Sequence, residues 1–348
     1  MKPLKAGLIG CGRIGSLLEN DPLRGKPCTH AGAFNALPSV RLTAGCDIDP
    51  GRLRRFGAQW GVSRLYTDYR EMLEAENLDL VSIAAWTHLH CEMALACARA
   101  GVRGVLCEKP IALNLNEARR MVQTFRKRGI PLVINHERRW DPYYRLAKRL
   151  IDRGRIGEVR TLIGNALSGP PGKAPVSRYG GGPLFHDGTH LTDLLLFFGG
   201  PVAWVSGQER RPGGRRYVEE TACALLQFQN GAVGFIEGGG ARRYFNFELD
   251  IQGSEGRLLI GNGGQALFLT RRSRRFTGFQ ELEPVPFPRP KRYESPFTGA
   301  VRDLVRCVRR GVPSESSGED GLRALQLILA VYQSAQNGGR RVRVGELR

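Results

Sequence analysis

A lysine that follows a predicted buried strand is the first residue whose position suggests chemistry. Lys109 lies in the tripeptide Glu108-Lys109-Pro110, directly after the apolar segment 102–107. Its ammonium group is suited to hold a substrate hydroxyl by hydrogen bonding and to take part in proton transfer. A surface lysine in a strand-to-helix turn would carry the same tripeptide, so the residue types leave both interpretations open.

Two histidines lie in a second segment that could do chemistry, the stretch 180–193 that opens with three glycines. His186 and His190 are four residues apart, so they share one face if the segment is helical. A histidine near a lysine can take the proton of a hydroxyl while hydride leaves the carbon. Metal binding is disfavoured because no third ligand stands at a suitable spacing. Histidines with a purely structural role are the alternative, and Asp187 lies about 100° around a helix from His186.

A phosphate-binding turn is indicated near the N-terminus by the spacing of three glycines. Gly10, Gly12 and Gly15 form G-x-G-x-x-G after a short apolar strand, with Arg13 and Ile14 inside the turn. Glycines at these positions allow the tight turn, the close approach of a pyrophosphate and the packing of helix on strand. We expect a helix to begin here, with its free N–H groups facing the phosphates.

An acidic residue at the end of the second predicted strand supports dinucleotide binding. Asp47 would accept hydrogen bonds from both ribose hydroxyls and repel a 2′-phosphate, which favours NAD over NADP. It lies 32 residues after Gly15, and an insert with proline and glycine at 20–29 explains the long spacing. Arg52 could approach a 2′-phosphate, but on an exposed helix we interpret it as a solvated charge.

The elements that would position these residues change character along the chain. Up to residue 134, apolar strands alternate with amphipathic helices, which predicts an α/β domain with a doubly wound parallel sheet. Ligands bind outside the carboxyl ends of such strands, where Thr87, His90 and Glu108 complete the expected cofactor site. From residue 135 to 348, strands separated by loops rich in glycine and proline predict a second domain with a largely antiparallel sheet.

Composition limits the class of protein and its partners. The 348 residues carry a net charge of +19 and contain no apolar run of about 18 residues, the length that crosses a membrane. A strand begins too early to leave room for a signal peptide, so we expect a cytoplasmic protein.

The arginine runs at 210–216, 271–275 and 340–343 favour solvated surface over an anionic partner, and nucleic acid is disfavoured because no recognisable module accompanies them. The eight cysteines show no C-x-x-C and are expected to be buried and reduced.

The glycine turn, Asp47, Glu108-Lys109-Pro110 and the segment leading to His190 together resemble the Gfo/Idh/MocA family of NAD(P)-dependent sugar and cyclitol oxidoreductases. The resemblance covers nearly the whole chain, including Asn135 and Arg138-Arg-Trp-Asp-Pro. It implies an N-terminal Rossmann domain and a C-terminal α+β domain for substrate binding and oligomerisation, whose open sheet commonly forms a dimer interface. It also implies that Lys109 is the active-site lysine and His190 the acid/base histidine.

Two positions depart from the family pattern. The aspartate that the family usually places four residues before the histidine is His186 here, so either His186 or Asp187 is expected to orient a neighbouring hydroxyl. The usual Thr-Pro after the fourth strand is Ala85-Trp86, followed by Thr87.

These observations predict an NAD-dependent dehydrogenase, homodimeric or homotetrameric, that transfers hydride at a secondary alcohol or hemiacetal carbon of a sugar, sugar derivative or cyclitol. Lys109 and His190 are expected to meet beside the nicotinamide, and Asn135, His136 and Arg138 are candidates for contacts to a polyol. Two alternatives are a related enzyme that uses NAD transiently for sugar elimination or glycoside cleavage, and a non-catalytic regulator that binds nucleotide.

Overall fold

The computed structural model describes residues 2–347, and the chain divides into two compact units. The first unit consists of Met1–Asp141 and Tyr293–Leu322, and the second of Pro142–Arg292 and Arg323–Arg348. This division differs from a single boundary after residue 134, because a segment near the C-terminus returns to the first unit.

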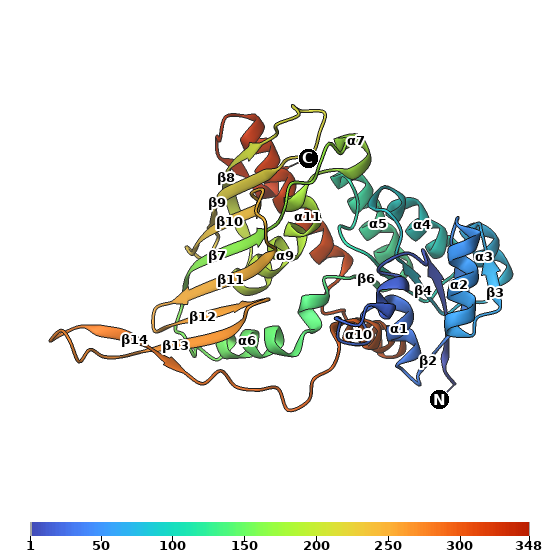
Figure 1. The fold of residues 1–348 in the computed structure, drawn as a ribbon, viewed down its shortest axis with the longest axis horizontal. Coiled ribbons are helices and arrows are strands. Elements are labelled where there is room, and N and C mark those ends of the chain that lie inside the picture. Colours follow the sequence, from blue (N-terminus) through green and yellow to red (C-terminus); the bar gives the residue numbers. More distant parts are fainter. Residues whose placement is uncertain (1, 348) are drawn as a thin grey trace. The chain divides into compact units, whose positions relative to one another are not determined.

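The first unit is built on a parallel sheet whose six strands run in the order β3-β2-β1-β4-β5-β6 (Figure 1). The order places the crossovers on both faces of the sheet and confirms the predicted Rossmann arrangement. The strands are β1 (Leu4–Ile9), β2 (Val40–Cys46), β3 (Arg64–Tyr66), β4 (Leu80–Ile83), β5 (Gly104–Cys107) and β6 (Leu132–Ile134). The helices are α1 (His30–Asn35), α2 (Pro50–Trp60), α3 (Tyr69–Ala75), α4 (Thr87–Arg99), α5 (Leu115–Arg128) and α10 (Pro296–Arg310), with the 3-10 helices η1 (Leu17–Asn20) and η2 (Glu137–Trp140).

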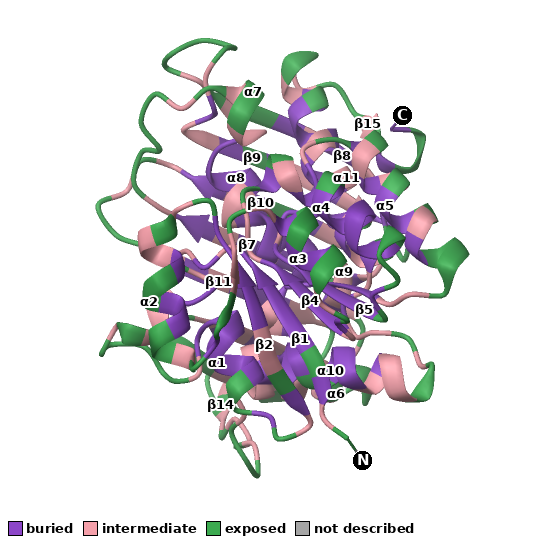
Figure 2. Cartoon of the chain, turned by 90° about the vertical axis from the view of Figure 1, so that its right-hand side faces the viewer, coloured by how far each residue is buried: buried purple, intermediate pink, exposed green. Residues whose placement is uncertain are grey.

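Helix α10 explains why residues 293–322 belong to the first unit. Its buried residues Ala300, Val301 and Leu304 join one core cluster with Phe34 of α1 and Leu106 of β5. Figure 2 shows β1, β4 and β5 of this sheet as buried. Burial of this apolar helix face ties the segment to the parallel sheet through the hydrophobic effect.

The helix predicted to begin at the glycine turn is interrupted. Residues 17–20 form only the 3-10 helix η1, and the α-helix α1 starts at His30. The His30 N–H donates to the carbonyl of Ile14 at 3.2 Å, and the Ala31 N–H donates to Gly15 at 2.9 Å. Helix α1 therefore follows directly on the glycine turn in space, and the predicted insert forms a loop that interrupts the beginning of that helix.

The second unit contains a mixed sheet of nine strands in the order β14-β13-β12-β11-β7-β10-β9-β8-β15 (Figure 1). Within this sheet only the β7–β10 pair is parallel among the described strands, which confirms a mostly antiparallel sheet. The strands are β7 (Val159–Leu167), β8 (Val202–Arg210), β9 (Thr221–Phe228), β10 (Val233–Gly239), β11 (Asn246–Gly253), β12 (Gly256–Gly261), β13 (Gly264–Arg272), β14 (Gln280–Val285) and β15 (Val342–Arg343). The last three of these were not predicted, because β13 and β14 are largely exposed and β15 has two residues.

Helices cover one face of this sheet and leave the other exposed. The helices of the unit are α6 (Pro142–Asp152), α7 (Val176–Tyr179), α8 (Pro183–His186), α9 (Gly188–Gly199) and the later part of α11 (Gly318–Gln336), with the 3-10 helix η3 (Val344–Glu346). Leu191 of α9 packs so closely on β7 that a Cβ at Gly164 would lie 2.6 Å from it. On the other face, Cys223 is exposed, and Phe235 is 47% exposed.

Two sequence expectations about the surface can be compared with the structure. Seven of the eight cysteines are buried, as predicted, and Cys223 is the exception. From the sequence we expected the arginine runs to lack interleaved aromatic groups, but the run 271–275 is followed by the exposed pair Phe276 and Phe279, whose rings lie 6.3 Å apart. Within residues 2–347 no helix combines the length and the apolar character that a membrane span requires.

Candidate active site

The carboxyl ends of five parallel strands form one row. Ile9 pairs in register with Cys46 and with Ile83, and Cys107 pairs with Ile83 and with Ile134. The residue after each strand end continues the row by a backbone hydrogen bond to a neighbouring strand, as when the Glu108 N–H donates to the Ile83 carbonyl at 2.9 Å. The residues that follow this row are Gly10, Asp47, Ala84, Glu108 and Asn135. Most residues predicted for the cofactor site are thus brought to one edge of the sheet.

Two glycines of the turn are required because a side chain would collide with the backbone, whereas the third lies beside open space. A Cβ at Gly10, where φ is +92°, would lie 2.5 Å from the Ala84 carbonyl oxygen, and one at Gly15 would lie 2.0 Å from the Gly10 oxygen. A Cβ at Gly12 would meet only Arg52 Nη1, at 3.8 Å. Backbone packing therefore requires Gly10 and Gly15, whereas Gly12 leaves room above the turn for a phosphate group. Arg13 is exposed and Ile14 half-buried in this turn.

The Asp47 carboxylate lies against the glycine turn and is only 5% exposed. Its Oδ2 accepts the Cys11 N–H at 2.8 Å and its Oδ1 accepts the Asp49 N–H at 2.9 Å. Arg52 Nη1 lies 3.3 Å from both carboxylate oxygens, and its Nη2 lies 3.3 Å from Asp49. The interpretation of Arg52 as a solvated charge was wrong, because this side chain forms an ion pair with Asp47 beside Gly12.

A buried network holds Glu108 at the end of β5. Its Oε1 accepts the Asn135 amide at 2.6 Å and lies 2.8 Å from His30 Nε2, and the Lys109 N–H donates to its Oε2 at 3.3 Å. Burial acts to raise the pKa of Glu108, but the hydrogen bond and charge of His30, with the charge of Lys109, bring it down to about 2. Glu108 is therefore an ionised group that orders the segment from which the half-buried Lys109 projects.

His30 was missed as a site residue by reasoning from the sequence. It is fully buried, and its other ring nitrogen, Nδ1, is hydrogen-bonded to Ser82 Oγ of β4. The ring also packs edge-on against Phe297 of α10 at 5.8 Å. Thr29, a good helix cap whose hydroxyl accepts the Gly32 N–H, was the one local signal that a helix starts at His30.

His90 connects two loops at the same edge of the sheet. Its Nδ1 lies 2.9 Å from the Pro110 carbonyl oxygen and its Nε2 lies 3.1 Å from that of Ala85. Burial lowers the pKa of His90. The Lys109–Pro110 peptide bond is cis, and Thr87 is buried in the first turn of α4. Since both ring nitrogens face backbone carbonyls, His90 shapes the edge by holding these loops.

The residues after β6 have mostly structural partners in the first unit. The Asn135 amide donates to Glu108, and Arg138 pairs with Glu137 at 2.9 Å. His136 is buried, and burial raises the pKa of Glu137. Their proposed contacts to a polyol remain a prediction.

The predicted histidine segment belongs to the second unit, whereas Lys109 belongs to the first. His186 is the last residue of α8, and Asp187 has helical backbone angles between α8 and α9. The His186 ring lies edge-on to Phe185, with ring centroids 5.4 Å apart, and His190 is buried in the first turn of α9. The segment is helical on both sides of Asp187, which is the condition under which the two histidines were expected to share a face. No group of three metal-ligating side chains occurs among residues 2–347.

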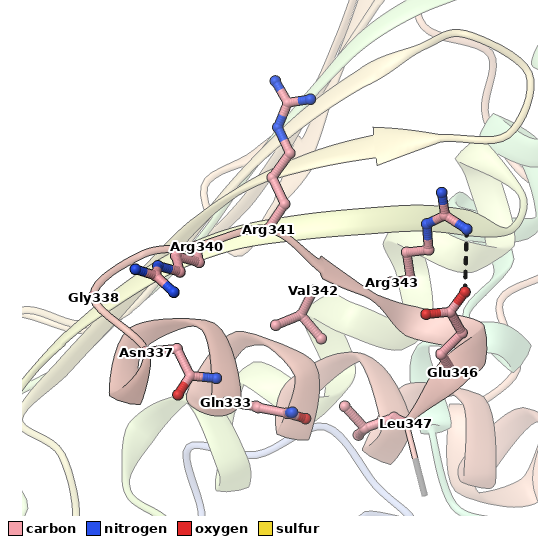
Figure 3. A pocket seen from close by; sticks show the side chains of 9 residues that line it. All are labelled: Gln333, Asn337, Gly338, Arg340, Arg341, Val342, Arg343, Glu346 and Leu347. Atoms are coloured by element: carbon pink, nitrogen blue, oxygen red, sulfur yellow. Dashed lines mark hydrogen bonds and ion pairs between the residues drawn. The ribbon is translucent and has the colours of Figure 1, made fainter.

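A cavity of about 1100 Å³ in the second unit contains none of the predicted site residues. It lies between the end of α11 and β15, beside the arginine run 340–343 (Figure 3). Arg341 stacks on Trp204 at 4.2 Å, and Arg343 pairs with Glu346 at 3.1 Å. Figure 3 shows Arg340 and Arg341 pointing in different directions, so these guanidinium groups do not converge on one anion.

Comparisons with known proteins cover both units. Residues 4–136 match the GFO_IDH_MocA model, described as an oxidoreductase family with an NAD-binding Rossmann fold, and residues 144–259 match the GFO/IDH/MocA C-terminal domain. The chain is 29% identical to D-apiose dehydrogenase of Paraburkholderia graminis over 97% of this chain and 89% of that protein. It is 27% identical to myo-inositol 2-dehydrogenase of Thermotoga maritima, with 96% of each chain covered. A solved oxidoreductase from Agrobacterium radiobacter, in complex with NAD+, L-tartaric acid and magnesium, is 25% identical over the whole of both chains, with a TM-score of 0.78.

Proposed function

We propose that this chain, which belongs to the Gfo/Idh/MocA family of NAD(P)-dependent oxidoreductases, is an NAD-dependent dehydrogenase of a sugar, sugar derivative or cyclitol. The reacting group is a secondary alcohol or hemiacetal carbon. The observation that carries the proposal is the row of strand ends, which gathers the glycine turn, Asp47 and Glu108-Lys109 at one edge of the parallel sheet. The substrate class is supported by relatives that are D-apiose and myo-inositol dehydrogenases.

The residues at this edge fit a dinucleotide. Open space at Gly12 suits a pyrophosphate, and the buried Asp47 carboxylate suits the two hydroxyls of the adenosine ribose. A 2′-phosphate would meet this carboxylate, and the preference for NAD over NADP rests on that repulsion. When bound, the nicotinamide supplies the carbon that accepts or donates hydride.

Lys109 and His190 have separate roles in the proposal. Lys109 Nζ donates a hydrogen bond to the oxygen of the reacting alcohol, which stabilises negative charge as the hydroxyl proton leaves. His190 takes that proton, and because its Nδ1 is buried we assign the transfer to Nε2. His186 or Asp187 orients a neighbouring hydroxyl. Both side chains are partly exposed.

The proposed assembly is a homodimer formed through the open face of the nine-stranded sheet. The strands β7, β8, β9 and β10 line a shallow hollow of about 400 Å³ on that face, where Phe235 and Leu225 lie beside polar groups such as Gln208. An exposed sheet face that mixes apolar and polar side chains is typical of an interface. The cytoplasmic location expected from the sequence remains a prediction.

The test is a panel of sugars and cyclitols with the purified protein and NAD, followed by NADH absorbance. On the best substrate, Lys109→Ala should lower kcat by at least about a hundredfold, the size expected for lost acid–base help, while calorimetry shows unchanged NAD binding. Lys127→Ala, which removes an exposed lysine of α5, is the matched control and should behave as the wild type. Wild-type turnover by Lys109→Ala would remove Lys109 from the mechanism. Formation of products without net NADH would instead identify the protein as the related kind of enzyme that uses NAD transiently for sugar elimination or glycoside cleavage.

A further inference from the structure

A buried carboxylate of the second unit, Glu219, lies against the glycine triplet that precedes the histidine segment. Its side chain is 0% exposed. Its Oε2 accepts the Gly182 N–H at 2.7 Å, and its Oε1 accepts both the Leu184 N–H at 3.1 Å and the Tyr332 hydroxyl at 2.7 Å. All three partners donate, which is the pattern that suits an ionised carboxylate.

One cation lies near this buried charge. Arg211 Nη2 is 3.9 Å from Glu219 Oε2, and the same nitrogen is 2.7 Å from Glu209. The Arg211 guanidinium also lies 5.4 Å from the centre of the Tyr332 ring. Burial raises the pKa of Glu219, and the hydrogen bonds from Tyr332 and Gly182, with the charge of Arg211, act against this rise. A buried carboxylate that lacked such donors and a cation would be strongly unfavourable.

The Glu219–Tyr332 pair explains why this segment contains consecutive glycines. A Cβ at Gly181 would lie 2.5 Å from the Tyr332 hydroxyl oxygen, and one at Gly182 would lie 2.2 Å from the Glu219 carbonyl oxygen. Neither position has room for a side chain. A Cβ at Gly238 of β10 would also lie 2.8 Å from the Leu184 Cα. The glycines of the segment and of β10 therefore permit its backbone to pack closely here.

We call Glu219 and its hydrogen bonds to Gly182, Leu184 and Tyr332 the anchor. The anchor connects directly to the histidines. Gly182, whose N–H donates to Glu219, is also the residue whose carbonyl accepts the His186 N–H, at 3.0 Å. The next bond in this turn runs from the Asp187 N–H to the Pro183 carbonyl at 3.1 Å, and the His190 N–H donates to the Asp187 carbonyl at 3.2 Å. A shift of Gly182 would therefore move the turn that carries His186 and the start of the helix that carries His190.

We infer that Glu219 is a positioning residue, which through its bonds to Gly182 and Leu184 sets the placement of His186 and His190 for the proton transfer. The inference rests on the proposed function for the role of the histidines. Glu219 touches neither substrate nor reacting atoms in this role. It acts through the backbone of the segment 182–190.

The experiment compares Glu219→Gln and Tyr332→Phe with Glu220→Gln in the full chain. Glu220 is the adjacent residue and its carboxylate pairs with the exposed Arg210, so Glu220→Gln makes the same chemical change in a side chain that does not bond to Gly182 or Leu184. With the best substrate of the panel, we expect Glu219→Gln to lower kcat by about tenfold to a hundredfold, the cost of misplacing a catalytic group by about 1 Å. The affinity for NAD should not change, because the glycine turn belongs to the first unit. Tyr332→Phe leaves two of the three donors and should have a smaller effect of the same kind.

A second measurement keeps the inference testable whether or not a substrate is found. In protein labelled at histidine, the NMR signals of His186 and His190, assigned with single His→Gln variants, should shift in Glu219→Gln and less in Tyr332→Phe. Those of His30, His88, His90 and His136 should stay in place. Shifted signals without any turnover by the wild type would overturn the proposed function and support the anchor. Unshifted signals and unchanged kcat in folded Glu219→Gln would overturn the inference, and if that variant does not fold, unshifted signals in Tyr332→Phe would do so.

Discussion

Replacing Asp47 by asparagine should separate the binding of NAD from that of NADP. The carboxylate lies at the carboxyl end of β2, with one oxygen on the Cys11 N–H and the other on the Asp49 N–H. Arg52 lies 3.3 Å from both oxygens. The substitution keeps the shape of the side chain and one acceptor oxygen, but removes the negative charge and the second acceptor.

The size of the effect follows from these contacts. A hydrogen bond to a charged acceptor contributes about 1.5 to 3 kcal/mol, against about 0.5 to 1.5 kcal/mol for a neutral one. Since two ribose hydroxyls would share the carboxylate, we expect NAD binding to weaken by about 2 to 3 kcal/mol, or about 30- to 150-fold. NADP should bind as well as before or better, because the negative charge that repels its 2′-phosphate is gone and Arg52 is released from its ion pair.

The assay is calorimetric titration of the wild type and the variant with each dinucleotide, with urea unfolding as a check on the fold. Asp49→Asn is the matched control, because it makes the same change two residues away, in a side chain that also contacts Arg52. Asparagine is as good a helix cap as aspartate, so α2 should keep its start. We expect the control to bind both dinucleotides as the wild type does. A stable Asp47→Asn protein with wild-type affinity for NAD would refute the assignment of Asp47 to the ribose.

Three further predictions concern the charges and surfaces of the two units. The pKa of Glu108 is near 2 in the folded protein against an ordinary value of 4.5, so its ionised form stabilises the fold above about pH 4.5 and this contribution is lost as the pH falls toward 2. Urea unfolding should therefore show a stability difference between wild type and Glu108→Gln that stays constant from about pH 7 to about pH 5 and shrinks as the pH falls from about 4.5 toward 2, and a difference that stays constant below about pH 4 would contradict the low pKa. His30→Leu removes the ring next to this buried charge and should cost about 3 kcal/mol or more in the free energy of unfolding, whereas a loss below about 1 kcal/mol would show that the pair matters little. Phe235→Asp places a charge on the open sheet face, and light scattering should show a dimeric wild type and a monomeric variant; a monomeric wild type would remove the proposed interface.

Local signals in the sequence were sufficient for much of the fold and part of the candidate site. The alternation of apolar strands with helices indicated the parallel sheet, and the spacing of Gly10, Gly12 and Gly15 indicated the turn at the end of β1. Asp47 could be found because an acid at the end of the second strand has a physical reason to be there. The position of Glu108 and Lys109 followed from the rule that parallel strands end at one edge.

Contacts between distant residues were beyond such reasoning. The start of α1 depends on the carbonyls of Ile14 and Gly15, which lie on the other side of the insert. The pairing of His30 with Glu108 joins residues 78 positions apart, and the contact of Glu219 with Tyr332 joins residues 113 positions apart. No composition or spacing in a single sequence encodes which of many buried polar groups will be partners.

The sequence by itself determined the class of the two sheets, the glycine turn with its acid, and the helical spacing of the two histidines, because each depends on residues close together or on a repeating pattern. Only the tertiary structure decided that Arg52 pairs with Asp47, that His30 holds Glu108, and that Glu219 with Tyr332 leaves no room beside Gly181 and Gly182. The physical reason is that buried charges and close-packed backbone must satisfy one another wherever the fold brings them together.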